Sequence, residues 1–254
     1  MSKVPAADNT LRILTYLASV RGPVPAAGIA AALSLPRSSV YHLLTVLVQH
    51  GFVLHFPEAS RYGLGVTAYE LSSAFSRQQP LSRLGRPILA TLVDSLGESG
   101  HLAVLHGRDV VYIVEERAPH RPRLVTDVGV RLPAHLTASG RALLASLPAE
   151  QLRALYPDRE AFEARTGAGP QSYRELKTLL TDVRQRGYAT EDGDITPGFA
   201  SLAVSVRDHA GWPAAGIAVT FPKENIPITT WDSLAEQIRH AASQLSHRIR
   251  GIEN

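Results

Sequence analysis

The chain has 254 residues, of which 44% are hydrophobic, and this length is enough for two domains that each bury a core. It contains no cysteine, which excludes disulfides and thiolate metal sites. Its N-terminus does not resemble a signal peptide, and no run of about 18 apolar residues is present to span a bilayer, so we expect a cytoplasmic protein without a membrane segment.

The formal net charge of +3 is concentrated near the N-terminus. Residues 1–65 contain five basic and two acidic side chains, whereas residues 66–254 contain 21 of each. A surface that binds nucleic acid needs such an excess, because Lys and Arg displace the counterions of the phosphates. The N-terminal segment is therefore the candidate for contact with nucleic acid.

The N-terminal part of the chain shows the pattern of a winged helix-turn-helix. Apolar residues at helical spacing follow Asn9 and Thr10, either of which is a suitable N-cap, and the first helix is expected to end near residues 21–23. A second, alanine-rich helix is predicted after Pro25, and residues 34–36 are predicted to form the turn. In such a fold the helix after the turn lies in the major groove of DNA.

The third helix has the clearest periodicity. Apolar residues recur at i, i+3, i+4 and i+7 from Val40, which predicts one buried stripe, and Gly51 is expected to end the helix. Two short runs of β-forming residues, 52–56 and 61–64, then bracket a turn. This hairpin is the predicted wing.

Polar side chains occupy the outward face of the third helix. From its N-terminal half they can donate to or accept from base edges, and the wing is suited to phosphate contact. The residues expected to contact DNA are Arg37, Ser38, Ser39, Tyr41, His42 and Thr45 on the helix and Arg61 and Tyr62 on the wing. The same residues also suit the solvated face of an amphipathic helix. A sensor that acts through protein partners, without direct DNA contact, is therefore the alternative.

The rest of the chain alternates helical and strand patterns. Residues 66–97 are predicted as two helices, broken near Gln79 and Pro80, that link the domains and help to pair subunits. Beyond them, strands are expected at 101–106, 110–117, 199–206 and 214–221, and helices at 135–155, at 172–186 and from Leu234 to Ile249, with a turn at 209–211. This order favours an α+β domain in which helices flank an antiparallel sheet.

Three stretches resemble the IclR family of bacterial transcriptional regulators. The first, LPRSSVYHLLTVLVQHGFV followed by RYGLGVTAYELS, resembles the DNA-binding head of that family. LPAHLTASGRALLA (132–145) resembles a segment of its effector domain, with Arg141 in place of the usual Lys. RGYATEDGDITPGFASLAVSV (186–206) resembles its other signature, an acidic run followed by Gly and an alanine-rich strand. The match covers nearly the whole chain in the right order.

The resemblance implies a domain organisation and a function. It assigns a winged helix-turn-helix to residues 1–65, a helical linker to 66–80 and a GAF-like effector-binding domain to 81–254. The implied protein is a ligand-responsive regulator of a catabolic or metabolic operon, and repression is the usual mode of the family. It is expected to bind a pseudo-palindromic operator in double-stranded DNA as a homodimer or as a tetramer, a dimer of dimers.

The resemblance also implies an effector site. Carried over by position, its lining consists of Thr137, Ala138, Ser139 and Gly140 from the first signature and Glu191, Asp194, Ser201, Ala203, Ala218 and Thr220 from the second signature and the following strand. Hydroxyls and backbone N–H groups at a helix start can hold a carboxylate, so we expect a small organic or aromatic acid. The alternative for each hydroxyl is a bond to nearby backbone.

Several positions depart from the family pattern. His42 stands where Arg is usual, which leaves DNA binding expected but changes the expected base preference. Asp194 replaces a Glu, Ser201 stands where Cys is frequent, and Ala218 and Thr220 stand where Ser is frequent. The effector is therefore expected to differ from those of relatives.

Neither a metal site nor an enzyme is predicted. The histidines that are candidates for zinc lack the i, i+4 spacing of a helical ligand pair, although some relatives are thought to hold metal. These histidines are His101, His106, His120 and His135. A Ser139–His135–Asp194 triad has no G-x-S-x-G turn to support it, and no phosphate loop or dinucleotide fingerprint is present. We expect no cofactor.

Overall fold

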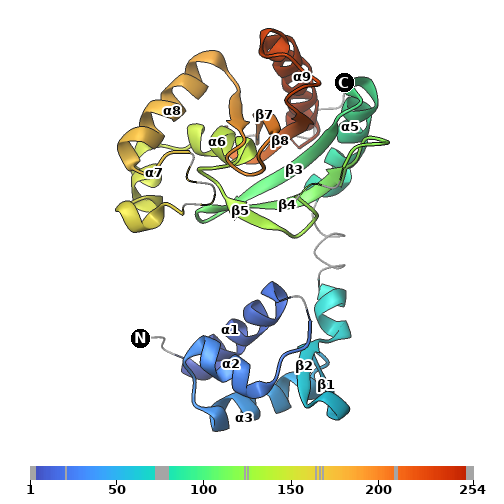
Figure 1. Cartoon of the computed structure of the whole chain (residues 1–254), viewed down its shortest axis with the longest axis vertical. Coiled ribbons are helices and arrows are strands. Elements are labelled where there is room, and N and C mark those ends of the chain that lie inside the picture. Colours follow the sequence, from blue (N-terminus) through green and yellow to red (C-terminus); the bar gives the residue numbers. More distant parts are fainter. Residues whose placement is uncertain are drawn as a thin grey trace. The chain divides into compact units, whose positions relative to one another are not determined.

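The computed structural model describes residues 4–20, 22–71, 80–122, 124, 126–163, 165, 167, 169–208 and 211–249. The chain forms two compact units, Met1–Gln79 and Pro80–Asn254 (Figure 1). The expected turn at 209–211 and the break near Gln79 lie partly outside the described residues. Among those that are described, no helix has the length and apolar character needed to cross a membrane.

The first unit is a winged helix-turn-helix, as predicted. Its elements are α1 (Pro5–Ser19), α2 (Ala26–Leu33), α3 (Arg37–Gln49), β1 (Val53–Phe56), the short 3₁₀ helix η1 (Pro57–Ala59) and β2 (Arg61–Leu64), followed by helical residues 66–71. The antiparallel strands pair Val53 with Leu64 and Phe56 with Arg61. The predicted apolar stripe of α3 packs against α1 and α2, with Val40, Leu44 and Leu47 buried.

The predicted start of the first helix is wrong. The helix begins at Pro5, a residue suited to the first helical turn because its missing N–H is not needed there. Thr10 lies inside the helix and its hydroxyl donates to the carbonyl of Ala6 at 2.8 Å. Asn9 accepts a hydrogen bond from Arg12 at 3.1 Å. Both polar side chains therefore bond within the helix instead of capping it.

The second unit is an α+β domain built on one antiparallel sheet. Its sheet has the order β5-β4-β3-β8-β7-β6. The strands are β3 (Ser99–His106), β4 (Asp109–Glu116), β5 (Arg131–Pro133), β6 (Ala189–Asp192), β7 (Phe199–Arg207) and β8 (Pro213–Pro222). The helices are α5 (Pro80–Leu96), α6 (Ala138–Ala145), α7 (Ala149–Leu155), α8 (Tyr173–Arg186) and α9 (Trp231–Ile249), with 3₁₀ turns η2 (Arg159–Ala161) and η3 (Ile228–Thr230).

Helices cover both faces of this sheet, and each face has its own core. Leu102 and Ile217 point to the core formed with α5 and α9, whereas their neighbours Ala103 and Ala218 point to the core formed with α6 and α8. The alternation follows from the two-residue period of a strand. The small residues on the α6 side let that helix approach the sheet closely.

Two details of this unit differ from the predicted elements. The single helix expected at 135–155 is split into α6 and α7, because Ser146 caps the end of α6 and Pro148 precedes α7. Strands β5 and β6 were not predicted. Each has only three or four residues at an edge of the sheet, too few for the alternation of apolar and polar residues to stand out.

Candidate functional site

The outward face of α3 presents the side chains predicted for DNA contact. Arg37, Ser38, Tyr41, His42 and Thr45 are exposed and Ser39 is half-buried. Tyr41 is 52% exposed, so its ring is accessible on this face. The apolar face of α3 packs into the core of the head, which holds the helix with its polar face exposed.

The two predicted wing residues are both engaged within the head. The Arg61 guanidinium is exposed and donates to the carbonyl of Pro23 at 2.9 Å. The half-buried ring of Tyr62 packs against the head core and stacks on His55 with 4.6 Å between ring centroids. Arg61 keeps further N–H donors for a phosphate, whereas the Tyr62 ring has a clear packing role.

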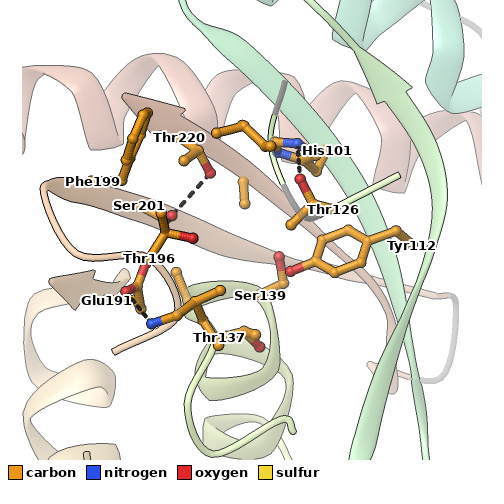
Figure 2. A pocket seen from close by; sticks show the side chains of 14 residues that line it. His101, Tyr112, Thr126, Thr137, Ser139, Glu191, Thr196, Phe199, Ser201 and Thr220 are labelled. Carbon is orange, nitrogen blue, oxygen red and sulfur yellow. Dashed lines mark hydrogen bonds between the residues drawn. The ribbon is translucent and has the colours of Figure 1, made fainter. Parts of the chain in front are cut away.

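The second unit contains a cavity between the start of α6, the loop after β6 and the face of the sheet that α6 covers (Figure 2). As it stands, the open space amounts to about 20 Å³ for the centre of a water-sized molecule, which is room for about one ordered water. The residues that line it are His101, Tyr112, Leu124, Thr126, Thr137, Ala138, Ser139, Glu191, Ile195, Thr196, Phe199, Ser201, Ala218 and Thr220.

The structure brings most of the predicted effector residues together here and leaves three out. Those that line the cavity are Thr137, Ala138, Ser139, Glu191, Ser201, Ala218 and Thr220. Gly140, Asp194 and Ala203 are absent from its lining. A Cβ atom on Gly140 would lie 2.2 Å from the carbonyl oxygen of Ala134, so this glycine lets α6 pack against the preceding turn. Ala203 belongs to the core beneath α6, and Asp194 pairs with Arg141.

A hydrogen-bonded chain of side chains forms one wall of the cavity. The Glu191 carboxylate accepts from the backbone N–H of Ile195 at 3.0 Å and from the Ser201 hydroxyl at 3.1 Å. Ser201 also bonds to the Thr220 hydroxyl at 2.9 Å. Burial raises the pKa of Glu191 above its usual range, and these hydrogen bonds oppose the shift only in part. The wall therefore presents an acidic group of unusual proton affinity.

The opposite wall contains residues that the sequence did not single out for this site. His101 is buried, and its Nε2 lies 2.6 Å from the hydroxyl of Thr126. Its Nδ1 has no hydrogen-bond partner among the described residues. Burial lowers the pKa of His101 to about 4, so the imidazole is neutral near pH 7. Tyr112 meets it edge-on, with 5.6 Å between ring centroids, and burial raises the pKa of its phenol.

The start of α6 provides the third part of the lining. The Thr137 side chain caps the helix by accepting from the Gly140 N–H at 3.0 Å. The Ser139 hydroxyl is buried, with 1% of the residue exposed, and has no partner among the described residues. A helix start carries partial positive charge, and an unpaired buried hydroxyl is costly. This corner is therefore suited to an anionic or hydrogen-bonding ligand group.

The described residues contain no group of three or more His, Asp or Glu side chains placed to hold a metal ion. His101 bonds to Thr126, and His135 Nε2 lies 3.1 Å from the carbonyl oxygen of Glu163. His106 Nδ1 lies 3.4 Å from an Arg131 nitrogen. The described contacts of these histidines are thus with protein groups.

Two domain families match this sequence. The IclR helix-turn-helix domain matches residues 6–55, and the C-terminal domain of bacterial transcriptional regulators of the IclR type matches residues 74–247. The chain belongs to the IclR family. It is a transcriptional regulator with a DNA-binding head and an effector-binding C-terminal domain.

Curated members of the IclR family are similar over most of their length. The transcriptional repressor IclR of Escherichia coli (strain K12) is 31% identical over 252 residues, which are 98% of this chain and 92% of that protein. The glycerol operon regulatory protein of Streptomyces coelicolor is 30% identical over 219 residues, 86% of this chain and 85% of that protein.

Solved IclR-family structures share the fold. A regulator from Silicibacter sp. TM1040 has a TM-score of 0.85 at 23% identity, with 96% of each chain covered. An IclR homologue from Microbacterium hydrocarbonoxydans, complexed with 4-hydroxybenzoate, has a TM-score of 0.81 at 21% identity, with 97% of this chain and 99% of that chain covered.

Proposed function

We propose that this IclR-family regulator represses a catabolic or metabolic operon and responds to a small organic or aromatic acid that binds in the cavity of Figure 2. The observation that carries the proposal is the corner at the start of α6. There the positive end of a helix meets the buried and unpartnered hydroxyl of Ser139. A carboxylate would satisfy both.

The ligand class is supported by the rest of the lining. The apolar surfaces of Tyr112, Phe199 and Ala218 are suited to a carbon skeleton or a small ring, while the polar groups orient it. The Microbacterium homologue that was solved with 4-hydroxybenzoate is a relative by fold that takes an aromatic acid. A ligand of several heavy atoms is larger than the present space, so its binding must displace side chains of the lining.

This displacement offers a basis for regulation. We infer that the regulator acts in the cytoplasm as a dimer, or as a dimer of dimers, and that effector binding changes the arrangement of its heads on the operator. A ligand shifts such an equilibrium only when it binds one arrangement better than the other. The exposed polar face of α3 is the proposed recognition surface, with Arg37, Ser38, Ser39, Tyr41, His42 and Thr45 toward the bases and Arg61 toward the phosphates. The half-buried Tyr62 is proposed to support the wing.

Mobility shift tests the DNA half of the proposal. With DNA from the promoter of its own or a neighbouring gene, we expect retardation that weakens steeply between about 50 and about 200 mM salt. A thermal-shift screen of small carboxylates tests the other half, because a ligand of the native state raises its apparent stability. A protein that retards no such DNA at low salt would support the alternative, a sensor that acts through protein partners.

A further inference from the structure

Glu191 brings an acidic group into a cavity proposed for an acid. Among the described lining residues it is the one carboxylate. The residue is only 3% exposed, and its two oxygens are fixed by the Ile195 N–H and the Ser201 hydroxyl (Figure 2). A carboxylate held this way cannot turn away from a ligand without giving up both hydrogen bonds.

No positive charge among the described residues forms an ion pair with Glu191. Arg141 of α6 is close enough to lower its pKa slightly, but its guanidinium donates to Asp194 and to the carbonyls of His135 and Thr190. Asp194 itself acts in the opposite direction and raises the pKa of Glu191. The charges of Arg141 and Asp194 therefore cancel, and an ionised Glu191 leaves the cavity with a negative charge.

The other titratable groups that face the cavity are neutral near pH 7. His101 on β3 has its pKa lowered to about 4, and Tyr112 on β4 has its pKa raised, in both cases mainly by burial. The groups contributed by β7 and β8 are the hydroxyls of Ser201 and Thr220. None of these offsets the charge of Glu191.

Two buried carboxylates at close range disfavour simultaneous ionisation, so one of them takes a proton. We propose that the cavity takes up an acidic effector together with one proton from solvent, and that Glu191 holds this proton in the complex. No covalent bond changes: the effector stays a carboxylate at the start of α6, and Glu191 becomes a carboxylic acid. The proposal rests on the acid effector proposed above.

Glu191 is a better acceptor for this proton than His101. Burial already raises the pKa of Glu191 in the free protein, so part of the cost of protonation is removed before the ligand arrives. For His101 the same burial works against the charged form. The protonated carboxyl also gains an O–H donor that the ligand can use. Above the pKa of Glu191 in the free protein, the site must therefore bind anions progressively less well, while uncharged ligands keep their affinity.

Calorimetric titration of the full-length protein measures the proton directly. The probes are 4-hydroxybenzoate and acetate, with 4-hydroxybenzamide as the uncharged counterpart, at about pH 6 and about pH 8 in buffers of different ionisation enthalpy. We expect uptake of close to one proton with the acids at the higher pH, and an affinity that falls up to about tenfold per pH unit. The amide is expected to show neither effect.

Matched variants assign the proton to its residue. E191Q keeps the shape of the side chain without its charge. Its amide oxygen can still accept from the Ile195 N–H, while its NH2 group donates to the Ser201 oxygen instead of accepting from it. The variant is expected to abolish proton uptake and to bind acids more tightly than wild type at the higher pH. D192N is the control, because Asp192 is the next residue on β6 but lies at the surface, paired with Lys223. Its titration is expected to match wild type. If E191Q does not fold, the comparison of acid and amide in the wild-type protein still decides whether a proton is taken up.

Three results would overturn the inference. If acids bind without proton uptake, the proposed protonation of Glu191 is wrong, but the proposal of an acid effector stands. Uptake that persists in E191Q and disappears in H101Q assigns the proton to the imidazole instead. If only the amide binds, at both pH values, or if no probe binds, the proposed acid effector fails and the inference falls with it.

Discussion

Arg141 of α6 forms a buried ion pair with Asp194, which lies 53 residues later in the loop after β6. The same guanidinium donates to the carbonyl of His135 at 2.8 Å and to that of Thr190 at 2.7 Å. It therefore fastens the turn before α6, strand β6 and the loop that carries Ile195 and Thr196 into the cavity wall. Arg141 stands where the family pattern has Lys, and a Lys ammonium lacks the planar fork needed to make these three contacts together.

Removing one partner of this pair is expected to destabilise the second unit strongly. D194A leaves the Arg141 guanidinium buried without its counter-charge, and loss of one partner of a buried pair costs about 3 to 5 kcal/mol. Urea unfolding followed by tryptophan fluorescence reports on this unit, because Trp212 and Trp231 both lie in it. The control is K223A, which breaks the surface pair between Lys223 and Asp192 and should cost at most about 1 kcal/mol. Equal losses in the two variants would contradict the role given to Arg141.

Removing each of two hydroxyls at the start of α6 is expected to have a different effect on stability. T137A removes the cap that accepts from the Gly140 N–H and is expected to lower the free energy of unfolding by about 1 to 2 kcal/mol. S139A removes a buried hydroxyl that has no described partner, so stability without ligand is expected to stay the same or rise. S139A should also lower the affinity for a small acid about five- to tenfold relative to wild type. Unfolding and calorimetric titration of both variants check this, and unchanged binding by S139A would count against the proposed carboxylate corner.

His101 is expected to make the second unit less stable in acid. Between the ordinary histidine pKa of 6.5 and the value of about 4 in the folded protein, the unfolded state binds a proton that the native state does not. Stability therefore falls as the pH drops through this range, by up to about 3 kcal/mol. The measurement is the urea midpoint of wild type and H101Q at several pH values. H101Q is expected to lose part of the slope, whereas H240Q, at an exposed position of α9, should retain it.

Two arginines of the head are expected to separate DNA binding from stability. Arg37 is exposed and makes no hydrogen bond or ion pair that is described within the structure. R37A should therefore change thermal stability by no more than about 0.5 kcal/mol while it weakens operator binding and lowers the salt slope by about 1. R61A also removes the bond to the Pro23 carbonyl and should cost about 1 kcal/mol of head stability. Operator binding that is unchanged in R37A would mean that the recognition helix has been placed wrongly.

Local patterns predicted the elements with strong periodicity and missed the weak ones. The stripe beginning at Val40 and the helical pattern at 172–186 are local signals, and both helices were confirmed. In the structure Ser172 caps the start of α8 and Gly187 ends it. The start of α1 was predicted five or six residues too late, because two good capping residues lie inside the helix. The edge strands β5 and β6 were missed because their pairing partners, and not their own few residues, make them strands.

The sequence by itself determined the winged head, the α+β class of the second unit and, through its resemblance to a family, much of one side of the cavity. Only the tertiary structure decided which side chains share that cavity. His101 reaches it because β3 pairs with β8 in a register that places it opposite Ala218. Gly140 and Ala203 instead pack around α6, and Asp194 pairs with Arg141. Periodicity shows which face of an element is buried, but contacts between residues far apart in the chain depend on register and on helix approach. Glu191 was already expected in this site from the resemblance, whereas the position of His101 in the same cavity is a property of the fold.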